Sequence, residues 1–377
     1  MIFHDICCKY QFEKKNQYLE FKMFYFTSLP VTIAFWIYGA ITVHHAFSLK
    51  NAKDKETLDF IKPTTYINEL MTAGLFFSSG LLHPFILLYS GLKPNTINFL
   101  YIFSTIIIFG GSSIWYIWGT MNYFKCKKDP EELKKRLDEE AQLLEKHRLQ
   151  TKLPMSADLK RKFLHVVIGI VVITAQLLSI LVKNFGWLDG TGFNREVIAI
   201  SIEMIIGYLF VFMIHYADTL RLYSYQQLPK WAKRWFFSSI GKEEMKTFVS
   251  SNPLVLTLTP FLLAPIPIFI NVALVSALAD AAAGLIGRKY GKKRFPKNSP
   301  KTIEGYIAGM ACTFVFVILF SILFNFGTYS HFIEILVAAI VATAVFLLVD
   351  IFCRDLSDNI LNPILTGAAL MLVYFYF

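Results

Sequence analysis

The sequence has few cysteines and lacks several features that would assign it to a class at once. Its five cysteines have the spacing of neither metal ligands nor a disulfide framework, which excludes a cysteine-rich metal site and a disulfide-rich fold; they are Cys7, Cys8, Cys126, Cys312 and Cys353. The first 23 residues are mixed and charged, so we expect no cleavable signal peptide. There is no internal repeat, which disfavours a transporter built from repeated halves.

Charge is also scarce, and apolar residues take its place. Hydrophobic residues make up 55% of the chain and aromatic residues 16%, and the mean hydropathy is positive. A helix needs roughly 20 residues to cross a bilayer. We therefore predict an all-α, polytopic membrane helix bundle with about ten spans, at 24–47, 67–91, 97–119, 163–184, 196–219, 253–268, 270–287, 303–325, 331–350 and 359–377.

The net charge of +10 is concentrated in three segments, 124–162, 220–250 and 288–301. Because loops rich in Lys and Arg stay in the cytoplasm, we expect all three on that side, separated by even numbers of crossings. The apolar stretch 253–287 must then cross twice, since a single helix of that length would measure about 52 Å against a core of about 30 Å. We predict a tight helical hairpin there, broken by Pro260, Pro265 and Pro267.

We predict three regions: an N-terminal membrane region with three spans, a charged cytoplasmic linker helix and a catalytic membrane domain with seven spans, at 1–123, 124–162 and 163–377. The linker helix should begin with Asp129 as N-cap, Pro130 at the first position and Glu132 at the third. Its apolar stripe is Leu133, Leu137, Ala141 and Leu144. We favour a solvated linker, with a helix lying on the membrane surface as the alternative.

One carboxylate, Asp280, lies at the edge of an apolar run, in the stretch DAAAGLIGRKYG. A charged side chain inside a span costs about 2.5 kcal/mol or more unless it has a partner, so an acid there is a functional candidate. Gly284, Gly287 and Gly291 follow at i+4, i+7 and i+11, on the same helical face. Packing of small residues between membrane helices explains the glycines but not the acid.

A second helix start follows Asp280. Ser299 and Pro300 predict an N-cap and a first helical position, which would place Lys301 and Thr302 in the first turn. The N-terminus of a helix binds anions. A metal-binding carboxylate beside a phosphate-binding helix start indicates nucleotide phosphates with Mg²⁺.

The basic loop 288–297 would close over the same anion. The positive-inside rule alone would account for most of its cations, but not for the predicted cap beside a buried acid. The spacing from Gly287 to Gly291 excludes a Walker A motif, so the site must belong to another nucleotide-binding class.

Further polar residues gather at the same predicted face. The stretch RKFLH places Arg161 and His165 one turn apart beside Lys162, where an interfacial histidine and part of a site are comparable interpretations. Asp218 and Arg221 follow one another at i, i+3 after another span, and a local ion pair is the simpler interpretation.

The loop before the last span is acidic. It contains Asp350, Asp355 and Asp358. Asp358 with Asn359 would cap the final helix, which is a sufficient structural reason for both residues.

The stretch DAAAGLIGRKYG…SPKTIEG resembles the nucleotide-binding segment of the CTP-dependent lipid kinases, which comprise dolichol, polyprenol, phytol and diacylglycerol kinases. The matching positions are Asp280, Ala283, Gly287, Arg288, Gly291, Lys301, Thr302, Glu304 and Gly305. RKFLH, ADTLRL and SDNILNP resemble three further segments in the same order, so the resemblance covers roughly 156–366. Ala279 and Ser357 depart from the glycine and the acid that are usual in that family.

The resemblance implies an enzyme closest to dolichol kinase, which transfers the γ-phosphate of CTP to a polyisoprenoid alcohol at the cytoplasmic membrane face. It implies catalytic roles for Asp280, Lys301, Asp358, His165 and Asp218, with Asp280 and Asp358 as ligands of Mg²⁺ or another divalent cation. Contacts to CTP would come from Gly284, Gly287, Arg288, Gly291, Lys297, Thr302, Glu304, Arg161, Lys162, Arg221 and Asn359.

Other functions stay open at this point. A CTP-dependent diacylglycerol or phytol/geranylgeraniol kinase and a CDP-lipid synthase need the same nucleotide, and a transporter is kept open by Glu203, an acid well inside a span. We expect a membrane lipid alcohol and the bilayer as partners, no nucleic acid, and a homodimer as one option. The membrane would be the endoplasmic reticulum or a prokaryotic plasma membrane.

Overall fold

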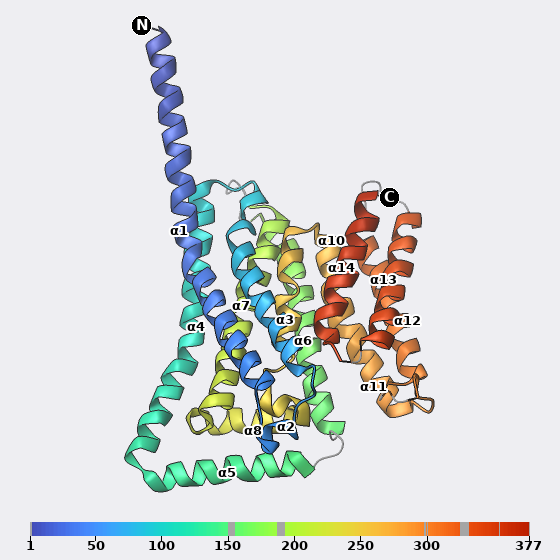
Figure 1. Ribbon diagram of the computed structural model, residues 1–377. Helices are drawn as coiled ribbons and strands as arrows, with labels where there is room; N and C mark the ends of the chain where they lie inside the picture. Colours follow the sequence, from blue (N-terminus) through green and yellow to red (C-terminus); the bar gives the residue numbers. More distant parts are fainter. Residues whose placement is uncertain are drawn as a thin grey trace.

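The computed structural model describes residues 2–149, 155–186, 193–297, 299, 301–324, 332–353 and 355–376, with side chains from Phe26 onward except at residues 55, 56, 89, 156, 157, 237 and 243. The described chain is a helix bundle (Figure 1), composed of α1 (Ile2–Lys50), α2 (Lys55–Leu58), α3 (Thr65–Leu82), α4 (Pro94–Lys128), α5 (Pro130–Leu149), α6 (Met155–Asn184), α7 (Arg195–Tyr223), α8 (Lys230–Ser239), α9 (Ser251–Leu256), α10 (Ile266–Leu274), α11 (Asp280–Tyr290), α12 (Ile303–Leu323), α13 (Phe332–Phe352) and α14 (Asp358–Tyr376).

Eight of the described helices are long and apolar enough to cross a membrane. They are Phe26–Lys50, Pro94–Lys128, Asp158–Asn184, Arg195–Tyr223, Ile266–Tyr290, Ile303–Leu323, Phe332–Phe352 and Asp358–Tyr376. The predicted fold class, an all-α polytopic membrane helix bundle, is confirmed.

Two of the ten predicted spans are helical but incomplete. The prediction at 67–91 corresponds to α3, whose first turns carry Asn68 and Glu69 and make it less apolar than the eight spans. The prediction at 253–268 corresponds to Ser251–Leu263, which is about 20 Å long and shorter than a hydrocarbon core of about 30 Å. Eight of the ten predicted spans thus have the length and composition of a full crossing among the described helices, whereas these two do not.

The predicted break within 253–287 is present. Pro265 has a φ of −51° and is the N-cap of α10, so the helix that ends at Leu263 does not continue. From Ile266 the chain runs through α10, one π-helical turn (Val275–Ala279) and α11 as a single, mostly buried span.

The predicted linker helix α5 begins as expected and lies across one end of the bundle (Figure 1). Asp129 Oδ1 accepts hydrogen bonds from the backbone N–H groups of Glu131 and Glu132, both at 3.1 Å. The three basic segments all lie at this end, as even numbers of crossings require (Figure 1). The side of the membrane that this end faces stays a prediction.

The apolar stripe predicted for α5 is only partly correct. Leu137 and Ala141 are exposed, whereas Leu143 and Leu144 pack against a buried cluster around α7 and α8. The buried Arg136 donates to the carbonyl of Gln226 at 2.6 Å. The helix is therefore fixed to the bundle by one face and is not a free linker.

The helices before α5 share a core with those after it. Phe35 of α1 makes edge-on contacts with Tyr208 and Phe212 of α7, at ring-centre distances of 4.7 and 4.9 Å. The Ser79 hydroxyl of α3 donates to Thr259 at 3.1 Å. These contacts fix α1 and α3 against α7 and the turn Thr259–Leu263.

Candidate active site

A cavity of about 250 Å³, here called the smaller cavity, lies where five helices meet. It is bounded by the starts of α6, α12 and α14, the end of α13 and the body of α11. Four acids and four cations line it: Asp158, Asp280, Asp350, Asp358, Arg161, Lys162, Arg288 and Lys301. All of these except Asp158 and Asp350 are predicted site residues, and the structure brings them together around one space.

Asp280 is held from the neighbouring helix α6. Lys162 Nζ forms an ion pair with Asp280 Oδ2, and His165 Nδ1 lies 3.3 Å from the same oxygen. The π-helical turn Val275–Ala279 directly precedes Asp280, and such turns frequently occur at functional sites. His165 is buried and does not line the cavity, so it lies behind the carboxylate and can orient it.

Lys301 connects the two acids of the C-terminal helices. Its Nζ lies 2.5 Å from Asp350 Oδ1 and 3.1 Å from Asp358 Oδ2. Burial lowers the pKa of Lys301, but the Asp358 and Asp350 carboxylates outweigh burial, so that this pKa is raised. Lys301 is therefore a firmly charged group at the centre of the site.

Asp158 was not predicted as a site residue. It forms ion pairs with Arg161 at 3.1 Å and with Arg288 at 3.3 Å, and so joins α6 to α11. Its position three residues before Arg161 was a usable signal. Asp350 carried the same signal as Asp280, an acid at the end of an apolar run.

The predicted start of α12 is wrong by several residues. The helix begins at Ile303, and Thr302 is its N-cap, whose Oγ1 accepts a hydrogen bond from the Gly305 N–H at 3.2 Å. Lys301 lies before the helix, where its carbonyl accepts a hydrogen bond from the Phe295 N–H. Pro300 lies outside the described residues.

The correction changes how an anion would be held here. The Ile303 N–H donates to the Lys293 carbonyl at 2.9 Å and the Gly305 N–H is used by Thr302, so this helix start does not offer them to a ligand. The pairing of backbone around 293–303 also fixes the basic loop beside α12 instead of leaving it to close over an anion. Positive charge in the cavity comes from side chains.

The predicted glycine face serves mainly helix packing. A Cβ on Gly287 would lie 2.9 Å from Thr302 Oγ1 and 3.1 Å from the Gly305 Cα, so α11 and α12 touch through their backbones. A Cβ on Gly284 would meet the Lys162 side chain at 2.9 Å. Gly291 ends α11 and packs against Thr302 outside the cavity. The packing interpretation therefore accounts for Gly287 and Gly291.

A second cavity of about 500 Å³, the larger cavity, adjoins the first. Four lining residues are common to both: Asp158, Arg161, Arg288 and Asp358. The predicted Asn359 lines the larger cavity. Six further lining residues come from the predicted N-terminal region and carried no sequence signal, namely Lys62, Thr64, Thr65, Asn68, Glu69 and Thr72.

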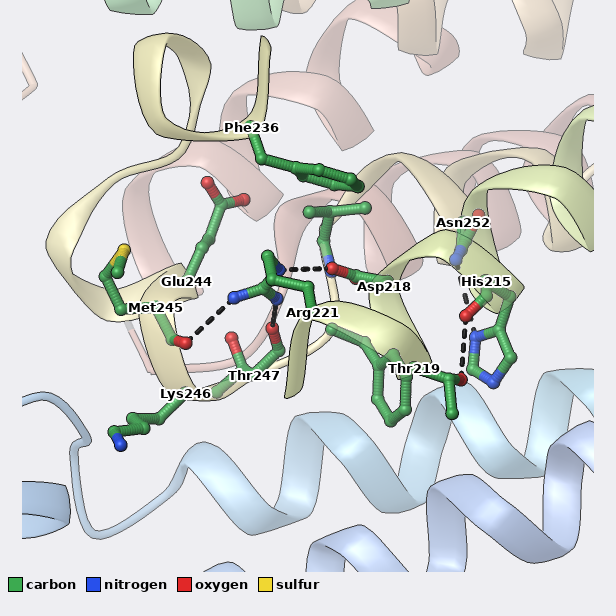
Figure 2. Close-up of polar contacts among 12 residues, drawn as sticks. His215, Asp218, Thr219, Arg221, Phe236, Glu244, Met245, Lys246, Thr247 and Asn252 are labelled. Carbon is green, nitrogen blue, oxygen red and sulfur yellow. Dashed lines mark hydrogen bonds and ion pairs between the residues drawn. The ribbon is translucent and has the colours of Figure 1, made fainter. Parts of the chain in front are cut away.

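Asp218 and Arg221 lie outside both cavities and stabilise a neighbouring segment (Figure 2). Arg221 donates to Asp218 Oδ1 at 2.6 Å and to the carbonyls of Met245 at 2.8 Å and Thr247 at 2.5 Å. Asp218 Oδ2 accepts from the Val249 N–H at 2.6 Å. The pair thus fixes residues 245–249, part of which forms the wall of the larger cavity.

Two further predicted contacts line neither cavity. Lys297 is exposed on the loop before α12, and Glu304 lines neither cavity.

The predicted metal ligands Asp280 and Asp358 both line the smaller cavity. The described residues contain no group of three His, Cys, Asp or Glu side chains arranged for a metal. Two carboxylates still fit Mg²⁺, because nucleotide-bound Mg²⁺ takes its other ligands from phosphates and water.

The sequence profile of the Cytidylyltransferase family matches residues 93–353, which is more than half of the chain. The chain belongs to this family. Its members are CTP-using, lipid-modifying enzymes, either cytidylyltransferases or kinases. No curated protein and no solved structure matches the chain.

The region that matches the family includes most residues that line the smaller cavity, but it does not include helices α1–α3. Asp158, Asp280, Lys301 and Asp350 lie within it. Asp358 at the start of α14 and all of α1–α3 lie outside. The part of the larger cavity that α3 forms is therefore not covered by the family match.

Proposed function

We propose that this protein is a CTP-dependent kinase that phosphorylates the hydroxyl of a polyisoprenoid alcohol of the dolichol or polyprenol type. The observation that carries the proposal is the smaller cavity, which combines carboxylates and cations at the ends of membrane spans. A lipid hydroxyl reaches such a position from the bilayer, while a nucleotide reaches it from water. We expect the cavity to face the cytoplasm, where CTP is available.

The ion pairs of the cavity suggest how the nucleotide is held. Lys162 and Lys301 each neutralise an acid, and a triphosphate would compete for both ammonium groups together with Arg288. Asp280 and Asp358 would then hold Mg²⁺, which neutralises phosphate charge when it is bound with CTP. Phosphoryl transfer depends mainly on positioning and electrostatic stabilisation, so these groups suffice in principle.

We assign His165 to positioning. Its Nδ1 lies 3.3 Å from Asp280 Oδ2, and the ring is buried behind that carboxylate. The lipid hydroxyl would meet the carboxylates of the cavity before His165, because these line the cavity and His165 does not. A cavity carboxylate that does not hold Mg²⁺ would therefore accept the hydroxyl proton, with His165 holding Asp280 in place.

A CDP-lipid synthase is the second candidate, and the name of the matching family favours it. Such an enzyme would form its product from the α-phosphate of CTP and needs the same cations and carboxylates. The stretch from Asp280 to Gly305 resembles the lipid kinases, and this resemblance is the reason we place the kinase first. Among kinases, diacylglycerol and phytol/geranylgeraniol remain alternative acceptors.

The acceptor is tested with purified protein in detergent, Mg²⁺ and CTP labelled at the γ-phosphate. Polyprenol, dolichol, phytol, geranylgeraniol and diacylglycerol are offered separately, and labelled lipid is extracted. We expect the highest kcat/KM with dolichol or polyprenol. Preference for diacylglycerol or phytol would retain the kinase and overturn the substrate class.

A further inference from the structure

The larger cavity has the position expected for the nucleoside part of a nucleotide. It continues from the smaller cavity through Asp158, Arg161, Arg288 and Asp358. A triphosphate held at Lys301 and Arg288 in the smaller cavity would therefore extend its ribose and base into the larger one. A polyisoprenoid chain is apolar and would be poorly matched to a lining rich in charged and hydroxyl side chains.

The wall formed by α3 is held rigidly in place. Asn68 uses both ends of its amide: Nδ2 donates to the Asp355 carbonyl at 3.1 Å, and Oδ1 accepts from the Ser357 N–H at 2.9 Å. These bonds fix α3 to the segment that leads into Asp358. The neighbouring Glu69 accepts from the Phe248 N–H at 3.0 Å through Oε1.

The second carboxylate oxygen of Glu69 is unused. Within the part of the chain that the structure describes, Glu69 Oε2 has no hydrogen-bond partner, and the residue is only 4% exposed. Leaving a buried polar atom unpaired costs about 1–3 kcal/mol in general, so such an atom requires an explanation. Glu69 also lines the larger cavity, where a ligand would supply the missing donor.

We propose that Glu69 recognises the base of the nucleotide by accepting a hydrogen bond from the 4-amino group of cytosine. Cytosine presents an amino donor at this position, whereas uracil presents a carbonyl oxygen that would face the ionised carboxylate without a proton between them. Burial raises the pKa of Glu69 to about 8, so this discrimination operates above that pH, where the carboxyl has lost its proton. Glu69 would thus select CTP over UTP, and it would do so from outside the region that matches the family. This inference rests on the proposed use of CTP.

The test compares CTP and UTP as phosphate donors for the wild type and for Glu69→Gln at about pH 9, where Glu69 is ionised because its pKa is raised to about 8. The glutamine carbonyl can still accept from the Phe248 N–H, while its amino group would donate to the uracil carbonyl. We expect the ratio of kcat/KM for CTP to that for UTP to fall by about tenfold or more. An unchanged ratio in a variant of normal stability would overturn the inference.

Glu203→Gln is the matched control. Glu203 is likewise buried, with one oxygen accepting from Gln176 at 2.9 Å and the other without a partner among the described residues, but it lines an apolar cavity between α6 and α7. We expect its CTP to UTP ratio to equal that of the wild type. An equal loss of selectivity in both variants would contradict a specific role of Glu69.

A binding measurement covers the case in which Glu69→Gln is inactive. Thermal unfolding of the wild type in detergent should shift upward more with CTP than with UTP, and this difference should shrink in Glu69→Gln. If the wild type uses CTP and UTP equally well, the inference about Glu69 is overturned while the proposed function stands. A wild type that neither binds nor uses CTP overturns the proposed function.

Discussion

Lys162 and Asp280 form an ion pair that joins α6 to α11 inside the smaller cavity. Lys301 makes the corresponding link between α13 and α14 through Asp350 and Asp358. The lysines that would bind the phosphates and the carboxylates that would bind the metal are thus paired with one another in the structure. Loss of either partner would leave the other charge unpaired and would remove a contact to the metal nucleotide, which leads to the following predictions.

Asp280→Asn should reduce product formation by a factor of about one hundred or more, because the variant keeps the size of the side chain but loses its charge next to the phosphates. The protein should still insert into the membrane, since α11 retains its apolar neighbours. Product formation is measured at equal amounts of extracted protein. Asp138→Asn, on the exposed face of α5, is the control and should be fully active. A fully active Asp280→Asn protein would rule out the assigned role.

Lys301→Met should also lower kcat/KM by about a hundredfold or more, because two acids lose their cation and the nucleotide loses a phosphate partner. Lys301→Arg keeps the charge and should retain more activity. The raised pKa of Lys301 places its deprotonation above the ordinary value of about 10.5, so its ion pairs persist below that pH and are lost only as the pH rises through the raised pKa.

The pH profile checks this assignment. Activity between pH 7 and 9 should show no alkaline decline that depends on Lys301. A decline near pH 8 that disappears in Lys301→Arg would contradict the account.

Asn68→Ala should lower kcat by roughly tenfold, because the segment before Asp358 loses two hydrogen bonds that are each worth about 1 kcal/mol. The measurement is a steady-state assay together with thermal unfolding of the same preparation. Asn51→Ala, at the exposed end of α1, should change neither quantity. Wild-type kcat in Asn68→Ala would show that this contact does not position Asp358.

Asp218→Asn should lower the free energy of unfolding by about 3–5 kcal/mol, because it leaves Arg221 charged and unpaired in a buried position. Asp59→Asn removes a partly exposed ion pair with Arg148 and should cost less than about 1 kcal/mol. Thermal unfolding in detergent compares the two variants. A stable but inactive Asp218→Asn protein would restore the catalytic role that the sequence suggests.

The strongest sequence signals came from charge in apolar surroundings. Asp280 stood out because nothing in a membrane span accounts for an acid, and the structure places it beside Lys162 and His165 of the RKFLH segment. Asp350 carried the same kind of signal at the end of its span. Such residues are predictable because burial of an unpaired charge is costly whatever the fold.

Local signals failed where tertiary contacts decided the outcome. Ser299 and Pro300 have the pattern of a helix start, but pairing of the backbone around Lys293 and Lys301 delays α12 until Ile303. The Asn68 and Glu69 contacts join segments about 180 to 290 residues apart in sequence, so no local pattern could predict them.

The most direct measurement of the central claim follows the two phosphates of CTP separately. Purified protein is incubated with Mg²⁺, dolichol and phosphatidate, and with CTP labelled at either the α- or the γ-phosphate. The account predicts γ-label in dolichyl monophosphate and no α-label in any lipid. Transfer of the α-label to a CDP-lipid formed from phosphatidate would contradict it and would establish a cytidylyltransferase.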